Sequence, residues 1–350
     1  MIAAITGATG HLGGTLARSL LERGHRVRAL VRGDQRALDG LDVEIVRGHL
    51  GDAASLERAF AGSDVVVHAA AHISLLRTDT RHVRAVNVDG TAAVLAACRS
   101  SGVRRLVHVS SIHALEQHPL DRPVNEDRPL VDERPPHRLP PYDRSKAESE
   151  RLVREAAGDR LATVILNPTG MFGPFDFKPS LFGRVLLALA NGRLPAVVDG
   201  GFDWVDIRDV AAAAATAAEQ LASLGAIDGS PCRRYLLPGR WASLAEVAGI
   251  VADLTGTPAP RWAAPLWVAS LGAPFSTAAA LAFGHRPLFT SVSLAALRNN
   301  PHVSGERAAA DLGYRARDLR ESVADTMAWF AERGVVSLHG RPAASPRSSS

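Results

Sequence analysis

Short apolar runs alternate with segments of helical spacing from the first residue of the chain. The run from Ile2 to Ile5 predicts a strand, and a glycine-rich turn follows it. Leucines then recur near one face of a helix at positions 12, 16, 20 and 21, until Gly24 ends that segment. The run RVRALVR at residues 26–32 predicts a second strand. Together these segments form one βαβ unit of the expected length.

The same alternation continues along the first half of the chain. Further strands are predicted at residues 43–48, 64–71, 104–111 and 161–168, and helices at residues 55–62, 87–102 and 147–157. Strands that alternate with helices are typical of a parallel sheet with helices on both faces. The sequence therefore predicts an α/β protein, with a doubly wound parallel sheet of the Rossmann type and a smaller, mostly helical carboxyl-terminal substrate domain.

The regular alternation ends near residue 168, which suggests a division of the chain. We expect a dinucleotide-binding domain at residues 1–167, to which a segment around residues 202–225 returns. Residues 168–336 are expected to form an interleaved substrate-binding region. Residues 337–350 are expected to form a disordered tail.

Composition narrows the class of protein. The chain has 350 residues, of which 46% are apolar and 22% charged, and this is ordinary for a soluble protein. The net charge is only +4 and the arginines are spread over many predicted helices, so nucleic-acid binding is not expected. Cys98 and Cys232 form no CxxC pair, which argues against a disulfide framework or a zinc site. With a first strand beginning at Met1, no signal peptide is expected, and a cytoplasmic location fits best.

One long apolar segment lies in the second half of the chain. Residues 262–285 contain no Asp, Glu, Lys or Arg, and they exceed the roughly 20 residues that cross a bilayer. Pro265, Gly272 and Pro274 interrupt the segment. We therefore expect helices that line a substrate pocket, ahead of attachment to a membrane surface and, last, a membrane span.

The turn after the first predicted strand has the composition of a phosphate-binding loop. TGATGHLG places Gly7, Gly10 and Gly13 between that strand and an amphipathic helix. In such a loop the first glycine permits a tight turn, the second lets the backbone approach a pyrophosphate, and the third permits close packing of helix on strand. The helix amino terminus adds amide groups and the positive end of its dipole. This position between strand and helix predicts a dinucleotide site.

A tyrosine and a lysine four residues apart stand where a proline-rich segment gives way to a helical pattern, in PPYDRSKAESE at residues 140–150. Positions four apart lie on one face of a helix, so Tyr142 and Lys146 can act together. A phenol has an ordinary pKa of about 10, and a neighbouring cation lowers that pKa. The pair is therefore a candidate general acid, although the same spacing also occurs by chance in helices without this function.

Taken in order, these motifs resemble those of the extended short-chain dehydrogenase/reductase family, the NAD-dependent epimerase/dehydratase superfamily. TGATGHLG resembles the family's TGxxGxxG, and YDRSK resembles its YxxxK. HVSS, which ends at Ser111, NVDGT from Asn87 and LNPTGMFGP from Leu166 match further landmarks of the family. RVRALVR and DFKPS are most similar to the dihydroflavonol-4-reductase-like branch, which includes 3β-hydroxysteroid dehydrogenase relatives.

The resemblance implies a role for each matching residue. Tyr142 would donate a proton, and Lys146 would lower the pKa of the tyrosine and bind the nicotinamide ribose. Ser111, ahead of Ser110, would bind the carbonyl oxygen of the substrate. Asn87 would support this network or cap a helix. The residues expected to contact the cofactor are Gly7, Thr9, Gly10, His11, Leu12, Gly13, Arg32, His49, Leu50, Ala69, Ala70, Ala71, Tyr142, Lys146 and Pro168. No metal site is expected.

The end of the second strand bears on the choice of cofactor. An acidic residue there binds the 2′-hydroxyl of NAD, whereas an arginine can pair with the 2′-phosphate of NADP. The chain has Arg32 at this place, with Arg36 one turn further on and Asp34 as the opposing charge. We therefore expect NADP, with NAD as the alternative. His49 stands where the family commonly has an aspartate for the adenine, and Asp52 follows three positions later.

The resemblance to the dihydroflavonol-4-reductase-like branch implies a reductase. We expect NADPH-dependent hydride transfer to a ketone or aldehyde of a small, largely apolar molecule. An NAD-dependent sugar-nucleotide epimerase or dehydratase is the first alternative, and a non-catalytic nucleotide-binding scaffold is the second. Sugar-nucleotide epimerases usually carry VYG after the serine strand, where this chain has Ile112, His113 and Ala114. The expected partner is a small-molecule carbonyl substrate, and a homodimer is compatible with the sequence.

Overall fold

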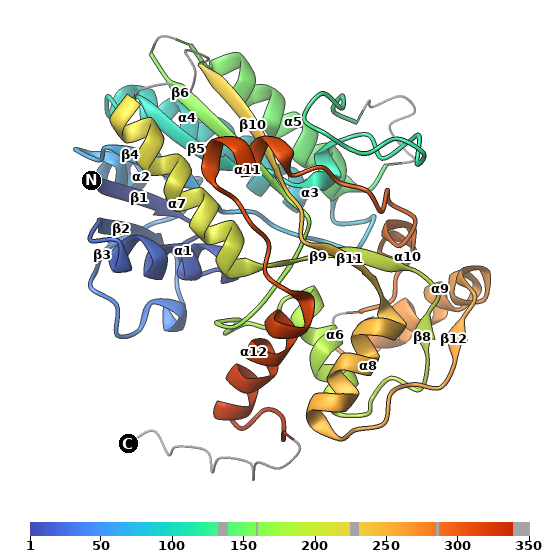
Figure 1. Ribbon diagram of the computed structural model, residues 1–350. Helices are drawn as coiled ribbons and strands as arrows, with labels where there is room; N and C mark the ends of the chain where they lie inside the picture. Colours follow the sequence, from blue (N-terminus) through green and yellow to red (C-terminus); the bar gives the residue numbers. More distant parts are fainter. Residues whose placement is uncertain (132–138, 159, 225–230, 285–286, 339–350) are drawn as a thin grey trace.

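The computed structural model describes the chain except for residues 132–138, 159, 225–230, 285–286 and 339–350 (Figure 1). Most of the expected carboxyl-terminal tail therefore lies outside the described residues. The described part has a central sheet with helices on both faces and a smaller, largely helical region beside it.

Seven parallel strands form the central sheet, in the order β10–β6–β5–β4–β1–β2–β3. They are β1 (Ile2–Thr6), β2 (Arg26–Val31), β3 (Val43–Arg47), β4 (Val65–His68), β5 (Arg105–Val109), β6 (Ala162–Pro168) and β10 (Cys232–Leu237). The six strands expected from the first half of the chain are all present. β10 was not predicted, because its run CRRYLL begins with polar residues. The strand order reverses between β1 and β4, and ligands usually bind at such a point, beyond the carboxyl ends of the strands.

Successive side chains of the inner strands point to opposite faces of the sheet, and both faces are buried. On β1, Ala3 and Ile5 belong to one apolar core and Ala4 to another. On β4, Val65 and Val67 likewise face one core, and the valine between them faces the other. Burial on both faces explains why these strands are continuous apolar runs in the sequence.

Helices cover the two faces in separate groups (Figure 1). One face carries α1 (His11–Glu22) and α7 (Ile207–Leu224), which pack on each other; the other carries α2 (Ala53–Phe60), α4 (Gly90–Ser100) and α5 (Pro141–Ala156). The fully buried alanines of α7 let this helix approach the sheet closely; they are Ala211, Ala214, Ala215, Ala217 and Ala218. After β6 the chain leaves the central sheet, and it returns to the sheet with α7 and then β10. Two segments from the second half of the chain therefore complete the sheet and its helical layer.

The smaller region has its own core, which includes Phe172, Trp204 and Phe330. Its strands are β7 (Gly170–Phe172), β9 (Gly201–Asp206) and β11 (Arg240–Ser243) in one sheet, and β8 (Val197–Val198) with β12 (Ala263–Ala264) in another. Its helices are α6 (Leu181–Ala190), α8 (Leu244–Thr255), α9 (Leu266–Ala282), α10 (Ser291–Ala296) and α12 (Leu319–Glu332). α11 (Glu306–Leu312) packs against α7 and β10. The remaining short elements are η1 (Arg36–Leu38), α3 (Thr80–Arg84), the π-helical turn η2 (Ala85–Asp89) and η3 (Ile112–Ala114).

The long apolar segment at residues 262–285 forms β12 and α9. In the part of the chain that the structure describes, no helix has the length and apolar character needed to cross a bilayer. Among the residues of α9, only Ala273 is fully buried. The segment is therefore a surface helix in this fold.

A buried ion pair ties α5 to the outer strand β10. Nη2 of Arg234 lies 2.7 Å from Oε1 of Glu150 in an ion pair, and the two side chains are 4% and 0% exposed. Arg234 also donates from Nη1 to the carbonyl oxygens of Glu126 and Arg128, at 3.0 and 2.9 Å. The pair therefore fixes three segments that are far apart in the sequence: the loop after β5, α5 and β10.

We expect Arg234→Ala to destabilise the fold by about 3–5 kcal/mol, because the variant leaves the Glu150 carboxylate buried without its main cation. Chemical denaturation measures this change in the free energy of unfolding. Arg320→Ala is the matched control: Arg320 pairs with Asp253 at 3.0 Å on the surface, and its loss should cost no more than about 1 kcal/mol. If both variants lost the same free energy of unfolding, the buried pair would contribute no more to stability than the surface pair.

Candidate active site

The glycine-rich turn joins β1 to α1 at the point where the strand order reverses. Gly7 has a φ of +74°, and a Cβ atom at this position would lie 2.6 Å from the backbone nitrogen of Ala70. A Cβ on Gly13 would lie 2.2 Å from the carbonyl oxygen of Gly7. No side chain caps the amino terminus of α1, where Gly10 is exposed. The turn thus leaves the first amide groups of α1 open to an anion, and it fits the pyrophosphate of a dinucleotide.

The other residues expected to contact a cofactor lie beyond the carboxyl ends of neighbouring strands. Ala69 to Ala71 follow β4, His49 and Leu50 follow β3, and Pro168 ends β6. His49 is turned toward its own backbone, since its Nδ1 accepts a hydrogen bond from Gly51 N at 3.2 Å. Asp52 caps α2 by accepting from Ser55 N at 3.2 Å, so its carboxylate is engaged locally.

The loop at residues 173–180 lies over α1 and the segment after β2. His11 donates from Nε2 to the carbonyl oxygen of Pro174 over 2.8 Å, and the guanidinium of Arg18 stacks 4.8 Å from the Phe175 ring centroid. Lys178 forms an ion pair of 3.2 Å with Asp34. These contacts join the loop that follows β7 to the dinucleotide half of the molecule. Thr9 lies in the glycine-rich turn, and Leu12, in the first turn of α1, is buried.

One face of α5 carries the residues that the sequence analysis singled out. Pro141 is the first residue of α5, so Tyr142 and Lys146 lie on the helix, as expected from their spacing. Lys146 is buried, and its Nζ donates to the carbonyl oxygen of Val109 over 2.7 Å. Tyr142 remains partly exposed, and its phenol lies next to the side chain of Ser111. The structure therefore brings Tyr142, Lys146 and Ser111 together at the carboxyl end of β5.

The two serines after β5 have different partners. Ser110 donates to Oε2 of Glu150 over 2.8 Å in the buried ion-pair network. The Oγ of Ser111 accepts from the backbone nitrogen of His113 at 3.2 Å and lies beside the phenol of Tyr142. The hydroxyl of Ser110 is thus engaged by Glu150, and Ser111 is the serine that lies beside Tyr142.

Asn87 connects the segment after β4 to α5. Its Oδ1 accepts from the backbone nitrogen of His72 at 2.7 Å, and its Nδ2 donates to His72 O and to Oγ of Ser145, at 3.1 and 2.9 Å. Ser145 in turn donates to the carbonyl oxygen of Tyr142 over 2.7 Å. Asn87 therefore supports the site through its side chain and does not cap a helix.

The pKa of Tyr142 differs from the sequence-based expectation. Loss of solvation raises the pKa of this phenol to about 12, although its hydrogen bond with Ser111 acts in the opposite direction. Burial also lowers the pKa of Lys146 to about 8, against the charge of Glu150, which raises it. The expected lowering of this pKa by Lys146 is not observed, because the loss of solvation dominates. Tyr142 is consequently held in its protonated form at neutral pH.

His113 and Asp143 flank the phenol, and the sequence analysis did not single them out as site residues. The His113 ring lies 6.0 Å from the Tyr142 ring, centroid to centroid, in an edge-on arrangement. Its Nδ1 is 3.4 Å from Oδ1 of Asp143. Burial alone would lower the pKa of His113, but the charge and hydrogen bond of Asp143 raise it above its usual value. The position of Asp143, next to the tyrosine in YDRSK, is the one sequence signal that could have indicated the pair.

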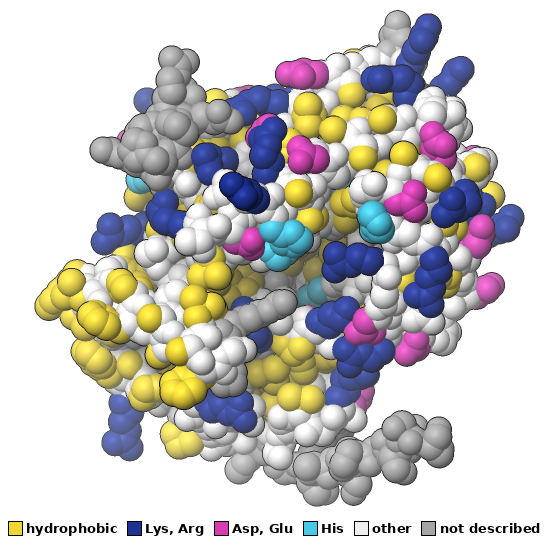
Figure 2. Space-filling view, turned by 180° about the vertical axis from the view of Figure 1, so that it is seen from behind, with side chains coloured by type: hydrophobic (Ala, Val, Ile, Leu, Met, Phe, Trp, Pro, Cys, Tyr) yellow, Lys and Arg dark blue, Asp and Glu magenta, His cyan; other side chains and the backbone are white. Residues whose placement is uncertain are grey.

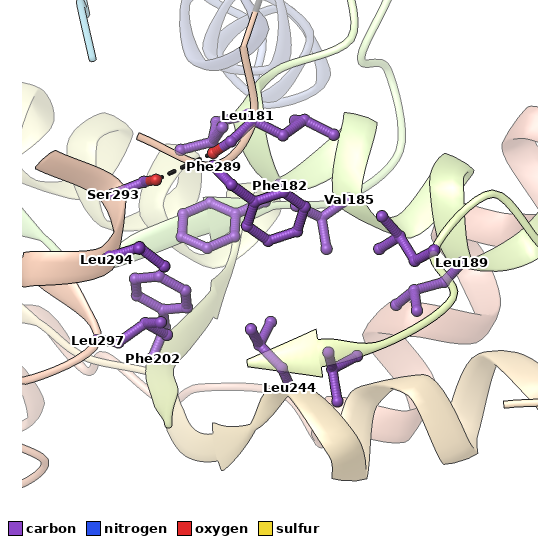
Figure 3. Close-up of a pocket in the computed structure, with 13 residues that line it drawn as sticks. Leu181, Phe182, Val185, Leu189, Phe202, Leu244, Phe289, Ser293, Leu294 and Leu297 are labelled. Atoms are coloured by element: carbon purple, nitrogen blue, oxygen red, sulfur yellow. Dashed lines mark hydrogen bonds between the residues drawn. The ribbon is translucent and has the colours of Figure 1, made fainter. Parts of the chain in front are cut away.

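An apolar pocket lies in the smaller region, between α6, β9 and the segment around α10 (Figure 3). Its lining is Leu181, Phe182, Val185, Leu189, Leu194, Val197, Phe202, Leu244, Leu288, Phe289, Ser293, Leu294 and Leu297. The hydroxyl of Ser293 donates to the carbonyl oxygen of Leu288 and accepts a hydrogen bond from the backbone nitrogen of Thr290. The lining includes no residue of 262–285, so the expectation that this segment lines the pocket is wrong for the pocket described here. The segment packs instead on the outside of the region.

Comparison with known proteins assigns the family. The model of the NAD dependent epimerase/dehydratase family matches residues 3–227. The chain belongs to this family. It is an NAD(P)-dependent oxidoreductase of the extended short-chain dehydrogenase/reductase type.

Several relatives match nearly the whole chain. "Sterol demethylase protein B" of Methylococcus capsulatus is 37% identical over 348 residues, which cover 96% of this chain and 100% of the relative. A "putative dihydroflavonol 4-reductase" of Synechocystis is 31% identical over 338 residues, 95% of each chain. The crystal structure of gox2253 superposes with a TM-score of 0.80 at 32% identity, over 96% of this chain and 99% of that one. The resemblance to the dihydroflavonol-reductase-like branch is thereby confirmed.

We expect Asp143→Asn to lower the pKa of His113, because the neutral amide no longer favours the imidazolium form. The chemical shifts of the His113 ring protons, followed by NMR as the pH is varied, measure this pKa. Glu148→Gln is the control, since Glu148 lies one turn along the same helix and pairs with Arg84. An unchanged His113 titration in Asp143→Asn would show that the carboxylate does not hold the charge of the imidazole.

Proposed function

We propose that the protein is an NADPH-dependent reductase that transfers a hydride to the ketone or aldehyde carbonyl of a small, largely apolar molecule. The observation that carries this proposal is the placement of the Ser111 side chain beside the Tyr142 phenol, with Lys146 on the next turn of α5. Two hydroxyl groups held together can both bind one carbonyl oxygen, where negative charge develops during reduction. Tyr142, Lys146 and Ser111 are therefore the proposed catalytic residues.

Each residue of the site has a separate task in this reaction. A bound nicotinamide dinucleotide supplies the hydride. Gly7, Gly10 and Gly13, with the first amide groups of α1, would hold the pyrophosphate. The phenol of Tyr142 donates its proton to the oxygen that becomes the alcohol. With a pKa of about 8, the ammonium group of Lys146 is mostly charged at neutral pH and favours the negative charge left on the phenol.

The apolar pocket supports an apolar substrate. Phe182 lines this pocket and also lies against Gly170, where a Cβ atom would come within 2.9 Å of its ring. Gly170 is two residues beyond the end of β6, so the Phe182 wall of the pocket lies toward the carboxyl end of that strand. The names of the two relatives, a sterol demethylase protein and a putative dihydroflavonol reductase, agree with a carbonyl on a largely apolar skeleton.

One experiment separates the reductase from its alternatives. The purified protein is mixed with NADPH and, in turn, with a 3-ketosteroid, an aliphatic ketone and a UDP-sugar, and the NADPH absorbance is followed. A reductase consumes NADPH with at least one of the ketones. An epimerase interconverts the UDP-sugar without consuming NADPH, and a scaffold protein does neither. Either of the last two results would overturn the proposal.

We expect Tyr142→Phe to reduce turnover by about 10²–10⁴-fold, the usual contribution of a general acid, while the affinity for NADPH changes little. Steady-state kinetics and a fluorescence titration with NADPH measure the two effects. Tyr235→Phe is a matched control. The Tyr235 hydroxyl lies outside the proposed site and donates a hydrogen bond of 3.0 Å to Asp311 Oδ2. Wild-type turnover in Tyr142→Phe would remove the tyrosine from the mechanism.

The preference for NADPH rests on the charges after β2. Arg32 is exposed and has no hydrogen bond or ion pair with any residue that the structure describes. Asp34, which would oppose a phosphate, accepts from Nη2 of Arg36 at 2.8 Å and pairs with Lys178. These partners lower the pKa of Asp34, Arg36 being the larger cause. A free arginine beside a neutralised carboxylate favours a 2′-phosphate over a 2′-hydroxyl.

We expect Arg32→Ala to weaken NADPH binding by roughly ten- to a hundredfold, since a hydrogen bond to a charged group contributes about 1.5–3 kcal/mol. NADH binding should hardly change. Calorimetric titration with both cofactors measures these affinities, and Arg26→Ala, at the opposite end of β2, is the control. If the unmodified protein binds NADH more tightly than NADPH, the NADPH assignment is wrong.

A further inference from the structure

The surface of the molecule carries one concentrated group of exposed large apolar side chains, on and beside α9 (Figure 2). Trp267, Leu271, Phe275 and Leu281 are 66%, 68%, 78% and 52% exposed. Trp262 before α9 and Phe283 after it are 57% and 78% exposed. We call these six residues the α9 face. They are six of the ten exposed large apolar side chains in the described part of the chain, and a group of this kind marks an interaction site.

The α9 face lies on one side of its helix. Trp267, Leu271 and Phe275 follow one another at a spacing of four residues, which places them in a row along the helix. The opposite side holds Ala273, which is 2% exposed, and Leu266, which packs against the core of the smaller region. α9 is therefore anchored by its inner side, and its outer side is apolar where a soluble helix is normally polar.

The charges near α9 favour an anionic lipid surface over a second copy of the chain. The sequence has no Asp or Glu between Asp253 and Glu306, whereas Arg261 and Arg298 are exposed in that interval. Two copies meeting through the α9 face would bring these arginines together without any acidic residue of the same segment to pair with them. A bilayer surface offers apolar chains for the tryptophan and phenylalanine rings and phosphate groups for the arginines.

We propose that the α9 face docks the protein on the surface of an anionic lipid bilayer, with α9 lying in the interfacial plane. The apolar pocket would then open next to the lipid. The segment after α9 supplies Leu288, Phe289, Leu294 and Leu297 to the pocket wall, and Thr277 of α9 donates to the carbonyl oxygen of Phe289 at 3.4 Å. If the proposed function is correct, docking would bring a substrate dissolved in the lipid to the pocket. The docking itself does not depend on the reductase reaction.

Cosedimentation of the full chain with lipid vesicles tests the proposal. Vesicles of phosphatidylcholine with phosphatidylglycerol are compared with vesicles of phosphatidylcholine alone. We expect the protein to sediment with the anionic vesicles and to bind the neutral ones more weakly. The triple variant Trp267→Gln, Leu271→Gln and Phe275→Gln should lose at least about tenfold in vesicle affinity. Arg261→Gln and Arg298→Gln should each weaken binding to anionic vesicles by about fivefold.

Control measurements keep the test independent of the enzyme activity. Trp241→Gln alters an exposed tryptophan on β11 and should leave vesicle binding unchanged. Circular dichroism, the melting temperature and NADPH titration check that the triple variant keeps its fold. Absence of vesicle binding by the unmodified protein would overturn the proposal. A second result would also overturn it: the unmodified protein forms a dimer in sedimentation velocity and does not bind vesicles, and the triple variant is a monomer. Neither result bears on the reductase assay with water-soluble ketones.

Discussion

The arrangement of the site depends on a single buried carboxylate, that of Glu150. Tyr142, Lys146 and Glu150 are four residues apart along α5 and therefore form one row on the side of the helix that faces the sheet. Glu150 accepts from Ser110 of the β5 end and from Asn167 of β6, at 2.8 and 2.9 Å, and pairs with Arg234 of β10. A fully buried charge is tolerated only with such partners. This requirement fixes the rotation of α5 and thus the direction in which the phenol and the ammonium group point.

Much of this architecture could be predicted from the sequence. The inner strands are largely continuous apolar runs because both of their faces are covered. The glycine turn is recognisable because backbone atoms fill the space where side chains would stand. YxxxK predicted a shared helical face, since that relation is local. Glu150, Arg234 and β10 were missed because their pairing joins segments more than eighty residues apart, and no local pattern reports it. The pKa of Tyr142 was predicted in the wrong direction for a similar reason: spacing gives proximity to Lys146, but not the burial of the phenol, which raises its pKa.

The apolar segment at residues 262–285 shows a different limit of sequence reasoning. Its composition is that of a buried helix, and burial in a pocket was the natural expectation. Only tertiary structure shows that the core of the smaller region accepts one side of α9 and leaves the other side exposed. Exposed apolar side chains are unfavourable in water, and this is the physical basis of the proposed docking on lipid.

The return of α7 and β10 to the central sheet also limits how this fold can be recombined. The smaller region is not one continuous stretch of sequence; it consists of an insertion between β6 and α7 and a second stretch after β10, broken by α11. A chimera that takes this region from a relative in one piece would carry away a helix and an edge strand of the nucleotide-binding half. An exchange of substrate regions would therefore have to be made as two separate grafts, with α7, β10 and the buried arginine on that strand left in place.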